Sequence, residues 1–290
     1  MTRLAATFMP ILLVVQTTAA QIVCVDDIQR SVRLPAPAQR IVSLAPSITE
    51  SLFAIGADDQ VCGVTDFCTY PSTAQKKAHV GGMTNPNIER IVNLKPDLIL
   101  LSMEGNTRRD FEQLTSLGTP VFVSNPRNLG DIRHSIEQLG VLTGHEQEAS
   151  ALTASLQARA ERVRIPSGSR RTTVLLLISL EPLFAAGRNT FIDDLLRHAG
   201  GENLAASAPG TYPALSREAV LVQDPAVIIL TSDLAPENGS LLVRFPEWEQ
   251  LTAARIGRVY RIDPDLVSRP GPRALDGLEL LSHFLHTDIR

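Results

Sequence analysis

Two glutamates hold matching positions in the chain, and each is placed where a carboxylate could take part in recognition. The segment from Glu89 reads ERIVNLKPDLILL, and the segment from Glu218 reads EAVLVQDPAVIIL. In each, a proline follows seven residues after the glutamate and an apolar run follows the proline. This pattern is typical of a short helix that leads into a strand buried on both faces. Two exposed carboxylates, one in each half of the chain, would steer and orient a partner with two-fold symmetry.

The same glutamates also have a purely structural interpretation. Asn87 and Ser216 lie two residues before them and are residue types that cap helix N-termini. A glutamate in the first helical turn stabilises the helix dipole by roughly 0.3–1 kcal/mol without any partner. Either glutamate alone fits both interpretations equally well, and their matching positions in the repeat favour a role in docking.

The remaining reactive side chains are too scattered for a metal centre or an enzyme. The histidines are His79, His134, His145, His198, His283 and His286. Only the last two share a helix face, and no carboxylate accompanies them at ligand spacing. The chain contains no CxxC, GxSxG, Walker or HExxH motif. We therefore expect a protein that binds its ligand without transforming it, with no metal or cofactor of its own.

The N-terminus predicts export. Arg3 precedes an apolar stretch over 8–15, and small residues follow up to Ala20, which is the pattern of a secretory signal peptide over 1–20. The apolar stretch is too short to span a bilayer. Val23 precedes Cys24, whereas lipid attachment requires a small residue directly before the cysteine. We therefore expect a soluble periplasmic protein, cleaved near Ala20, and not a lipoprotein.

Three cysteines would enter that oxidising compartment, namely Cys24, Cys62 and Cys68. At most one intramolecular bridge can form among them, and the sequence leaves open which pair closes, if any. Cys62 lies in an apolar strand and is expected to pack as a small hydrophobic residue.

These residues must be positioned by two α/β lobes. With 290 residues and 44% hydrophobic content, the chain can fill two cores. Strands alternate with helices over 21–127 and again over 166–290, which predicts parallel sheets. Residues 128–165 carry apolar side chains at helical spacing, with a break at Gly144 before a helix of about twenty residues, roughly 30 Å long. We expect this helix to join the lobes as a stiff strut, in contrast to a Gly/Ser linker.

Local sequence patterns predict where individual helices begin, and the net charge limits the class of partner. Ser47 and Glu50 have the spacing of a capping box at the start of the helix that follows strand 40–44. Further helices are expected around Trp248 and over 273–286. The net charge of −4 provides no basic field for nucleic acid or anionic lipid.

The order of elements and several sequence strings resemble the helical-backbone periplasmic binding proteins, which serve ABC importers of cobalamin, ferric siderophores and haem. The strings are RIVSLAPSITESLFAIGA (40–57), DFCTYP (66–71), NPNIERIVNLKPDLILL (85–101), LFAAGRNTFIDDLLRHAGGEN (183–203), YPALSREAV (212–220) and RPGPRALDGLELL (269–281). They are most similar to the cobalamin-binding branch. The resemblance implies two Rossmann-like α/β lobes with parallel sheets, joined by a single long α-helix, with a ligand cleft between them.

The resemblance also implies a set of ligand contacts. In the cobalamin-binding branch, aromatic rings surround the corrin, and these positions correspond to Phe67, Phe184 and Tyr212, with Tyr70 close to the first. Aromatic rings suit a large, flat, partly apolar ligand, and tyrosine adds a hydrogen-bonding tip.

Other expected cleft residues depart from the family pattern or have two interpretations. Met83 and Ser102 occupy two positions that are aromatic in the cobalamin-binding branch. Arg188 either faces an anionic ligand or is a solvated loop charge. Arg269 and Arg273 either line the cleft of the second lobe or cap the last helix.

The function implied by the resemblance is capture of a corrinoid, first of all cobalamin, and its delivery to an ABC importer. Glu89 and Glu218 would pair with arginines of a permease dimer in the inner membrane, and the protein would act as a monomer. The departures at Met83 and Ser102 leave open a ferric-siderophore or haem-binding protein of the same class. A sensor or scaffold that uses this fold without transport is a further alternative.

Overall fold

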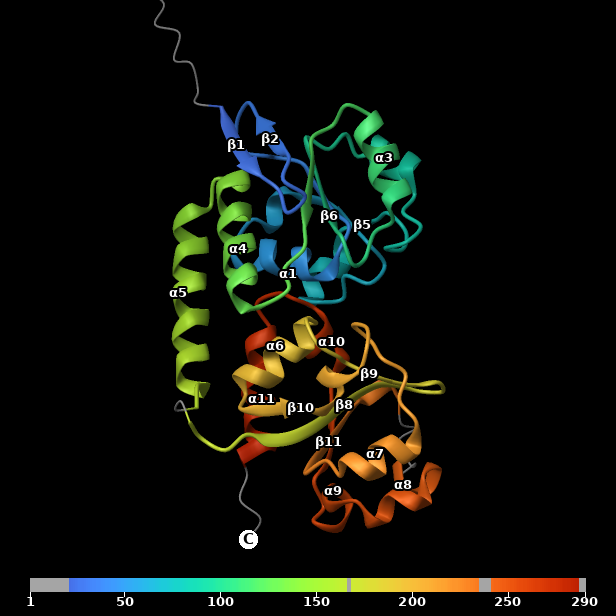
Figure 1. Cartoon of the computed structure of the whole chain (residues 1–290). Coiled ribbons are helices and arrows are strands. Elements are labelled where there is room, and N and C mark those ends of the chain that lie inside the picture. Colours follow the sequence, from blue (N-terminus) through green and yellow to red (C-terminus); the bar gives the residue numbers. More distant parts are fainter. Residues whose placement is uncertain (1–20, 166–167, 235–240, 287–290) are drawn as a thin grey trace, which may run out of the picture.

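The computed structural model describes residues 21–165, 168–234 and 241–286, so the expected signal peptide over 1–20 lies outside the described residues. Two α/β lobes are stacked one on the other, and a pair of helices lies along one side, the longer of them reaching from the first lobe to the second (Figure 1). The expected fold class is confirmed, and no helix among the described residues is long and apolar enough to cross a membrane.

The first lobe contains a five-stranded parallel sheet in the order β5-β4-β3-β6-β7. Its strands are β3 (Ile41–Ser43), β4 (Val61–Val64), β5 (Ala78–His79), β6 (Leu98–Ser102) and β7 (Val121–Ser124). Its helices are α1 (Pro46–Ala54), α2 (Ile88–Asn93) and α3 (Arg108–Ser116). An antiparallel hairpin of β1 (Ile22–Val25) and β2 (Ser31–Leu34) precedes the sheet.

The second lobe repeats this design around the order β10-β8-β11-β12, with β9 added antiparallel to β8. Its strands are β8 (Thr172–Leu180), β9 (Leu183–Ala185), β10 (Gly201–Asn203), β11 (Val227–Thr231) and β12 (Val259–Ile262). Its helices are α6 (Phe191–His198), α7 (Arg217–Gln223), α8 (Leu241–Arg244), α9 (Thr252–Arg255), α10 (Pro264–Ser268) and α11 (Ala274–His286).

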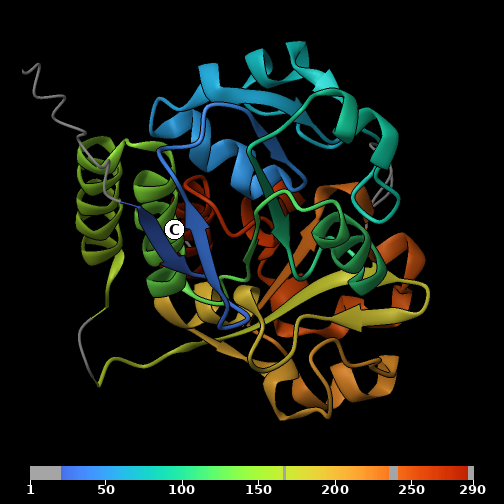
Figure 2. The ribbon, with the colours of Figure 1, turned by 90° about the horizontal axis from the view of Figure 1, so that it is seen from above.

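Helices α4 (Leu129–Thr143) and α5 (Glu146–Val163) join the lobes and lie side by side (Figures 1 and 2). Gly144 separates them in the left-handed conformation, with φ of 77°. The 18 residues of α5 span about 27 Å. Arg159 of α5 donates hydrogen bonds to Asp276 and Glu279 of α11, so the strut is fastened to the last helix of the second lobe.

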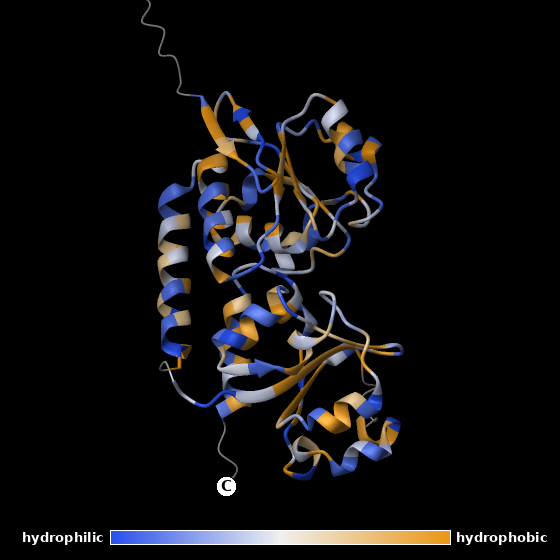
Figure 3. Ribbon diagram, viewed as in Figure 1, coloured by the Kyte–Doolittle hydropathy of each residue, from blue (hydrophilic) through white to orange (hydrophobic). Residues whose placement is uncertain are grey.

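One large hydrophobic core runs through both lobes and the two joining helices, with members such as Ile41, Leu139, Leu156 and Leu176. The hydropathy colouring shows apolar strands inside each lobe and hydrophilic positions along α5 (Figure 3). Trp248 is fully buried against Phe245, and the helix expected around it is a short 3₁₀ helix over Pro246–Gln250.

The expected capping box at the start of α1 is wrong. Pro46 occupies the first helical turn and Ala45 is the N-cap, with no side-chain cap hydrogen bond. Because the helix begins before Ser47, that residue lies inside the first turn, where its side chain cannot act as the cap. The Glu50 carboxylate therefore takes no part in capping and can bind a residue elsewhere in the chain.

Candidate functional site

The order of the strands indicates where a ligand site would form in each lobe. In the first sheet, the chain builds outward from β3 in one direction and from β6 in the other. Adjacent strands whose connections diverge leave a crevice at their carboxyl ends, which is where ligands bind in open α/β sheets. The strands β8 and β11 form the corresponding switch point of the second sheet.

The exposed aromatic rings of the described residues lie in two loops, one in each lobe. Phe67, Tyr70 and Tyr212 are 54%, 48% and 47% exposed. The first two follow β4 in the first lobe, and Tyr212 belongs to the second lobe. Large rings left in solvent on both lobes suit a surface that becomes covered when a ligand binds.

The fourth predicted ring, Phe184, is half-buried in β9, next to the segment that carries Tyr212. Phe184 forms a β-bridge with Ala214, and the Ala185 N–H donates to the Pro213 carbonyl over 3.2 Å. The structure thus brings Phe184 and Tyr212 onto neighbouring backbone segments of one lobe.

Asn106 fastens together the first-lobe segments that carry two of the predicted cleft residues, and the sequence interpretation missed it. Its Nδ2 donates to the carbonyls of Met83 (2.7 Å) and Leu44 (3.3 Å), and its Oδ1 accepts from the Ser102 N–H (2.9 Å). One side chain therefore joins three loops, including the predicted cleft residues Met83 and Ser102. The available signal was a polar residue that can donate and accept at once, four residues after the end of the buried strand β6.

Tyr212 of the second lobe lies within electrostatic range of two charged residues of the first lobe, Glu104 and Arg127. Burial raises the pKa of Tyr212 above its ordinary value of 10.0, the nearby charge of Glu104 raises it further, and Arg127 opposes both effects. Both charged residues belong to the first lobe, so they act on Tyr212 across the cleft.

Glu104→Gln is expected to lower the pKa of Tyr212, and Arg127→Gln is expected to raise it. The tyrosinate absorbance of each variant, after subtraction of a Tyr212→Phe background, measures the shift. Because the folded-state pKa is raised, the contribution of Tyr212 to stability is present below pH ~10 and is lost as the pH rises through the folded value. Two shifts of the same sign would contradict this placement of the lobes.

A buried ion cluster joins the lobes beside these rings. Both carboxylate oxygens of Glu50, on α1, accept from Arg273, at 2.9 Å from Nε and 2.7 Å from Nη2. Nη2 of Arg269 forms an ion pair with Asp265 (2.8 Å), and its Nη1 lies 3.5 Å from Glu50. The bonds to Glu50 raise the pKa of Arg273. Neither sequence interpretation of the two arginines anticipated this pairing with the first lobe.

Arg188 lies at the β10 edge of the second lobe. Its Nε donates to the Ala206 carbonyl over 3.0 Å, and it shares a surface hollow with Arg171 and Arg197. Its expected contact with the ligand stays a prediction.

Glu89 and Glu218 are both exposed near the N-termini of α2 and α7. The predicted caps are confirmed, since Asn87 accepts from the Arg90 N–H and Ser216 accepts from the Ala219 N–H. Hydrogen bonds from its own backbone and from Ser216 hold the pKa of Glu218 below its usual value. The structural interpretation of these glutamates is thus realised, and it leaves both carboxylates accessible.

The described part of the chain contains no candidate metal site and no disulfide. No group of three histidine, cysteine or acidic side chains there could hold a metal ion. All three cysteines are free; Cys24 and Cys68 are buried, and burial raises the pKa of the Cys24 and Cys62 thiols.

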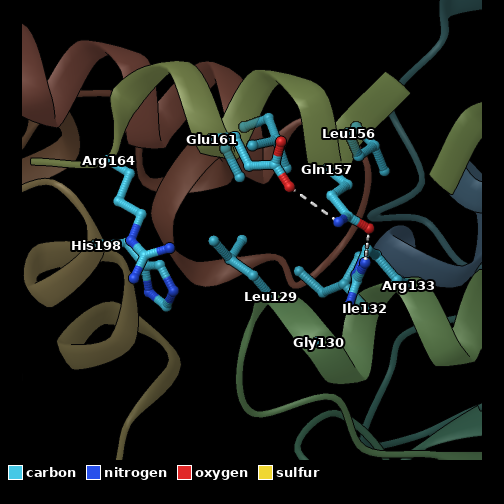
Figure 4. Close-up of a pocket in the computed structure, with 11 residues that line it drawn as sticks. Leu129, Gly130, Ile132, Arg133, Leu156, Gln157, Glu161, Arg164 and His198 are labelled. Carbon is cyan, nitrogen blue, oxygen red and sulfur yellow. Dashed lines mark hydrogen bonds between the residues drawn. The ribbon is translucent and has the colours of Figure 1, made fainter. Parts of the chain in front are cut away.

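A separate hollow of about 340 Å³ lies against the strut (Figure 4). Leu129, Leu156 and Leu275 form part of its wall, while Arg164 and His198 lie at one end. None of the predicted cleft residues lines it, so it is distinct from the interlobe site.

Comparison with known proteins gives a consistent result. Residues 41–266 match the family described as periplasmic binding protein. The chain is 31% identical to the uncharacterized ABC transporter substrate-binding lipoprotein YvrC of Bacillus subtilis, over 94% of this chain and 88% of that protein. It is also 31% identical to the vitamin B12-binding protein of Yersinia pestis, over 83% and 85% of the two chains.

Solved structures agree with these sequence relatives. The periplasmic vitamin B12 binding protein BtuF of Vibrio cholerae is 29% identical, with a TM-score of 0.77 over 86% of this chain and 96% of that one. A periplasmic haem-binding protein of Pseudomonas aeruginosa is 28% identical, with a TM-score of 0.76 over 87% and 94%. On its sequence and its two-lobed architecture, the chain belongs to the periplasmic binding protein family.

Proposed function

We propose that this protein captures a corrinoid, cobalamin, in the cleft between its lobes and delivers it to an ABC importer. More generally, the protein is a substrate-binding protein of the class that serves ABC importers for vitamin B12, haem or siderophores. The observation that carries the finer proposal is the set of exposed rings, with Phe67 and Tyr70 on one lobe and Tyr212 on the other. Rings on two opposing surfaces can cover both faces of a broad, flat, partly apolar ligand.

Calorimetric titration of residues 21–290 tests the ligand class directly. Cyanocobalamin is expected to bind saturably at one site, while haem and a ferric siderophore serve as competitors. Binding of an iron chelate in place of cyanocobalamin would overturn the corrinoid assignment. It would favour the second candidate, a haem or siderophore carrier, which the non-aromatic residues Met83 and Ser102 and the haem-binding relatives support.

We further propose that Glu89 and Glu218 dock the protein on the two halves of a permease dimer. Both are exposed and occupy equivalent helices, α2 and α7, that precede equivalent central strands. An exposed valine follows one turn later in each helix, with Val92 46% and Val222 86% exposed. Each lobe therefore offers a carboxylate beside an apolar contact.

Glu89→Ala together with Glu218→Ala is expected to weaken docking on the cognate permease by about 10-fold while leaving ligand affinity unchanged. Rim ion pairs contribute up to ~1 kcal/mol each, and 1.4 kcal/mol corresponds to a factor of ten. Binding to permease in nanodiscs at low and high salt measures the effect. Glu112→Ala with Glu202→Ala removes one exposed carboxylate from each lobe elsewhere and serves as the matched control. Loss of ligand binding in the first variant would move these glutamates into the cleft.

We propose that the protein is exported and that its mature form is not lipidated. A lipidated cysteine must be the first residue of the mature chain and must reach the membrane. Cys24 is instead paired with Val32 within the β1–β2 hairpin, and its side chain is 4% exposed in the core. This placement supports a periplasmic protein, although the relative YvrC is described as a lipoprotein.

A further inference from the structure

The buried ion pair between the lobes can form only in one relative arrangement of the lobes. Glu50 is 3% exposed on α1, and the arginine that binds both of its oxygens lies 223 positions later in the sequence. A buried carboxylate without its partner is strongly disfavoured, because its hydration is lost without compensation. Movement of the lobes apart at this point would therefore leave Glu50 uncompensated until water reached it.

The segment that presents the arginine is itself stiff and closely packed. Arg273 follows Pro270-Gly271-Pro272, in which two proline rings fix the backbone on either side of the glycine. A Cβ at Gly271 would lie 3.2 Å from the carbonyl oxygen and 3.4 Å from the Cα of Ser47. The backbone of one lobe thus rests directly on the first turn of α1 in the other.

Tyr70 connects this junction to the cleft. The guanidinium carbon of Arg273 lies 4.1 Å from the centroid of the Tyr70 ring, a cation–π contact. The tyrosine is still 48% exposed, so the contact leaves much of the ring available to a ligand. The orientation of Tyr70 therefore depends on where Glu50 holds Arg273.

We infer that the Glu50–Arg273 pair is an interlobe tie that sets the width of the cleft and orients Tyr70 for the ligand. Glu50 is in this sense a positioning residue, which acts on the ligand through Arg273 and Tyr70. The second part of the inference rests on the proposed function, whereas the first concerns the free protein alone.

Glu50→Gln is expected to increase amide hydrogen exchange in peptides covering 44–55 and 269–275 of the free protein. It is also expected to raise the dissociation constant for cyanocobalamin about 10-fold, because a neutral amide cannot hold both arms of the guanidinium. The matched control is Glu112→Gln, which changes an exposed carboxylate paired with Arg108 inside the first lobe. That control is expected to leave exchange and affinity as in the wild type.

A double-mutant cycle separates the tie from a general loss of stability. Glu50→Gln combined with Arg273→Met is expected to increase exchange no more than Arg273→Met alone, since the two residues share one interaction. Arg273→Lys keeps the charge, loses the two-armed contact and should give an intermediate result. It also provides a readout if Arg273→Met does not fold.

The results of these measurements separate the interlobe tie from the positioning of Tyr70. Wild-type exchange in Glu50→Gln, or additive effects in the cycle, would overturn the tie. Raised exchange with an unchanged dissociation constant would overturn the positioning of Tyr70. If cyanocobalamin fails to bind even the wild type, the corrinoid proposal fails, and the exchange measurements still decide whether the tie exists.

Discussion

Replacement of both Phe67 and Tyr212 by alanine is expected to lower the affinity for cyanocobalamin by about 1,000-fold. In the proposed complex the ligand covers both rings, and aromatic residues at the centre of such contacts typically contribute about 2 kcal/mol or more. Two independent losses of that size correspond to a factor of roughly 10³ in the dissociation constant. The rings lie on opposite lobes, so their effects on a rigid ligand should combine.

Calorimetry on the two single variants and the double variant measures this effect. Both rings are about half exposed in the free protein, so the midpoint of thermal unfolding should change little. Val243→Ala removes a side chain that is 77% exposed on α8, outside the cleft loops, and serves as the control. Wild-type affinity in the double variant would place the ligand elsewhere on the protein.

Gly187→Ala is expected to reduce both stability and ligand affinity. An added Cβ would lie 2.7 Å from Cδ of Pro213, 2.9 Å from the Gly210 carbonyl oxygen and 3.0 Å from the Thr211 carbonyl oxygen. Two of these three atoms belong to the backbone, so a side-chain rotation cannot relieve the overlap. The segment carrying Tyr212 must shift, and overpacking of this kind typically costs about 1–3 kcal/mol.

Urea unfolding and calorimetry together test this prediction. Gly118→Ala is the informative control, because its Cβ would meet nothing within 4 Å although its φ is +78°. That variant should lose about 1–2 kcal/mol of stability through backbone strain alone and keep its ligand affinity. Equal ligand affinity in Gly187→Ala and the wild type would show that the 210–213 segment does not position the binding surface.

Much of the fold was accessible from the sequence because its signals are local. Apolar runs flanked by proline and glycine mark the central strands β6 and β11, and Asn87 and Ser216 cap the helices as expected. The break at Gly144 was equally clear, since a left-handed turn favours glycine. These features depend on neighbours within a few residues.

The parts that could not be predicted depend on tertiary contacts. Glu50 fits a capping-box spacing, but its partner Arg273 is distant in sequence and is brought to it only by the stacking of the lobes. Asn106 joins three loops whose proximity follows from the sheet order. The ring positions came from family resemblance, because periodicity alone does not distinguish an exposed cleft aromatic from a core residue.

Whether the three free cysteines become oxidised depends on how soon folding buries them. Thiolate is the species that forms disulfides, and burial both shields the sulfur and, in Cys24 and Cys62, keeps it protonated by raising the pKa. Oxidants would therefore compete with folding during the interval before the β1–β2 hairpin closes over Cys24. Once that interval has passed, the rate at which the buried thiols react with an alkylating reagent reports how often the native structure opens.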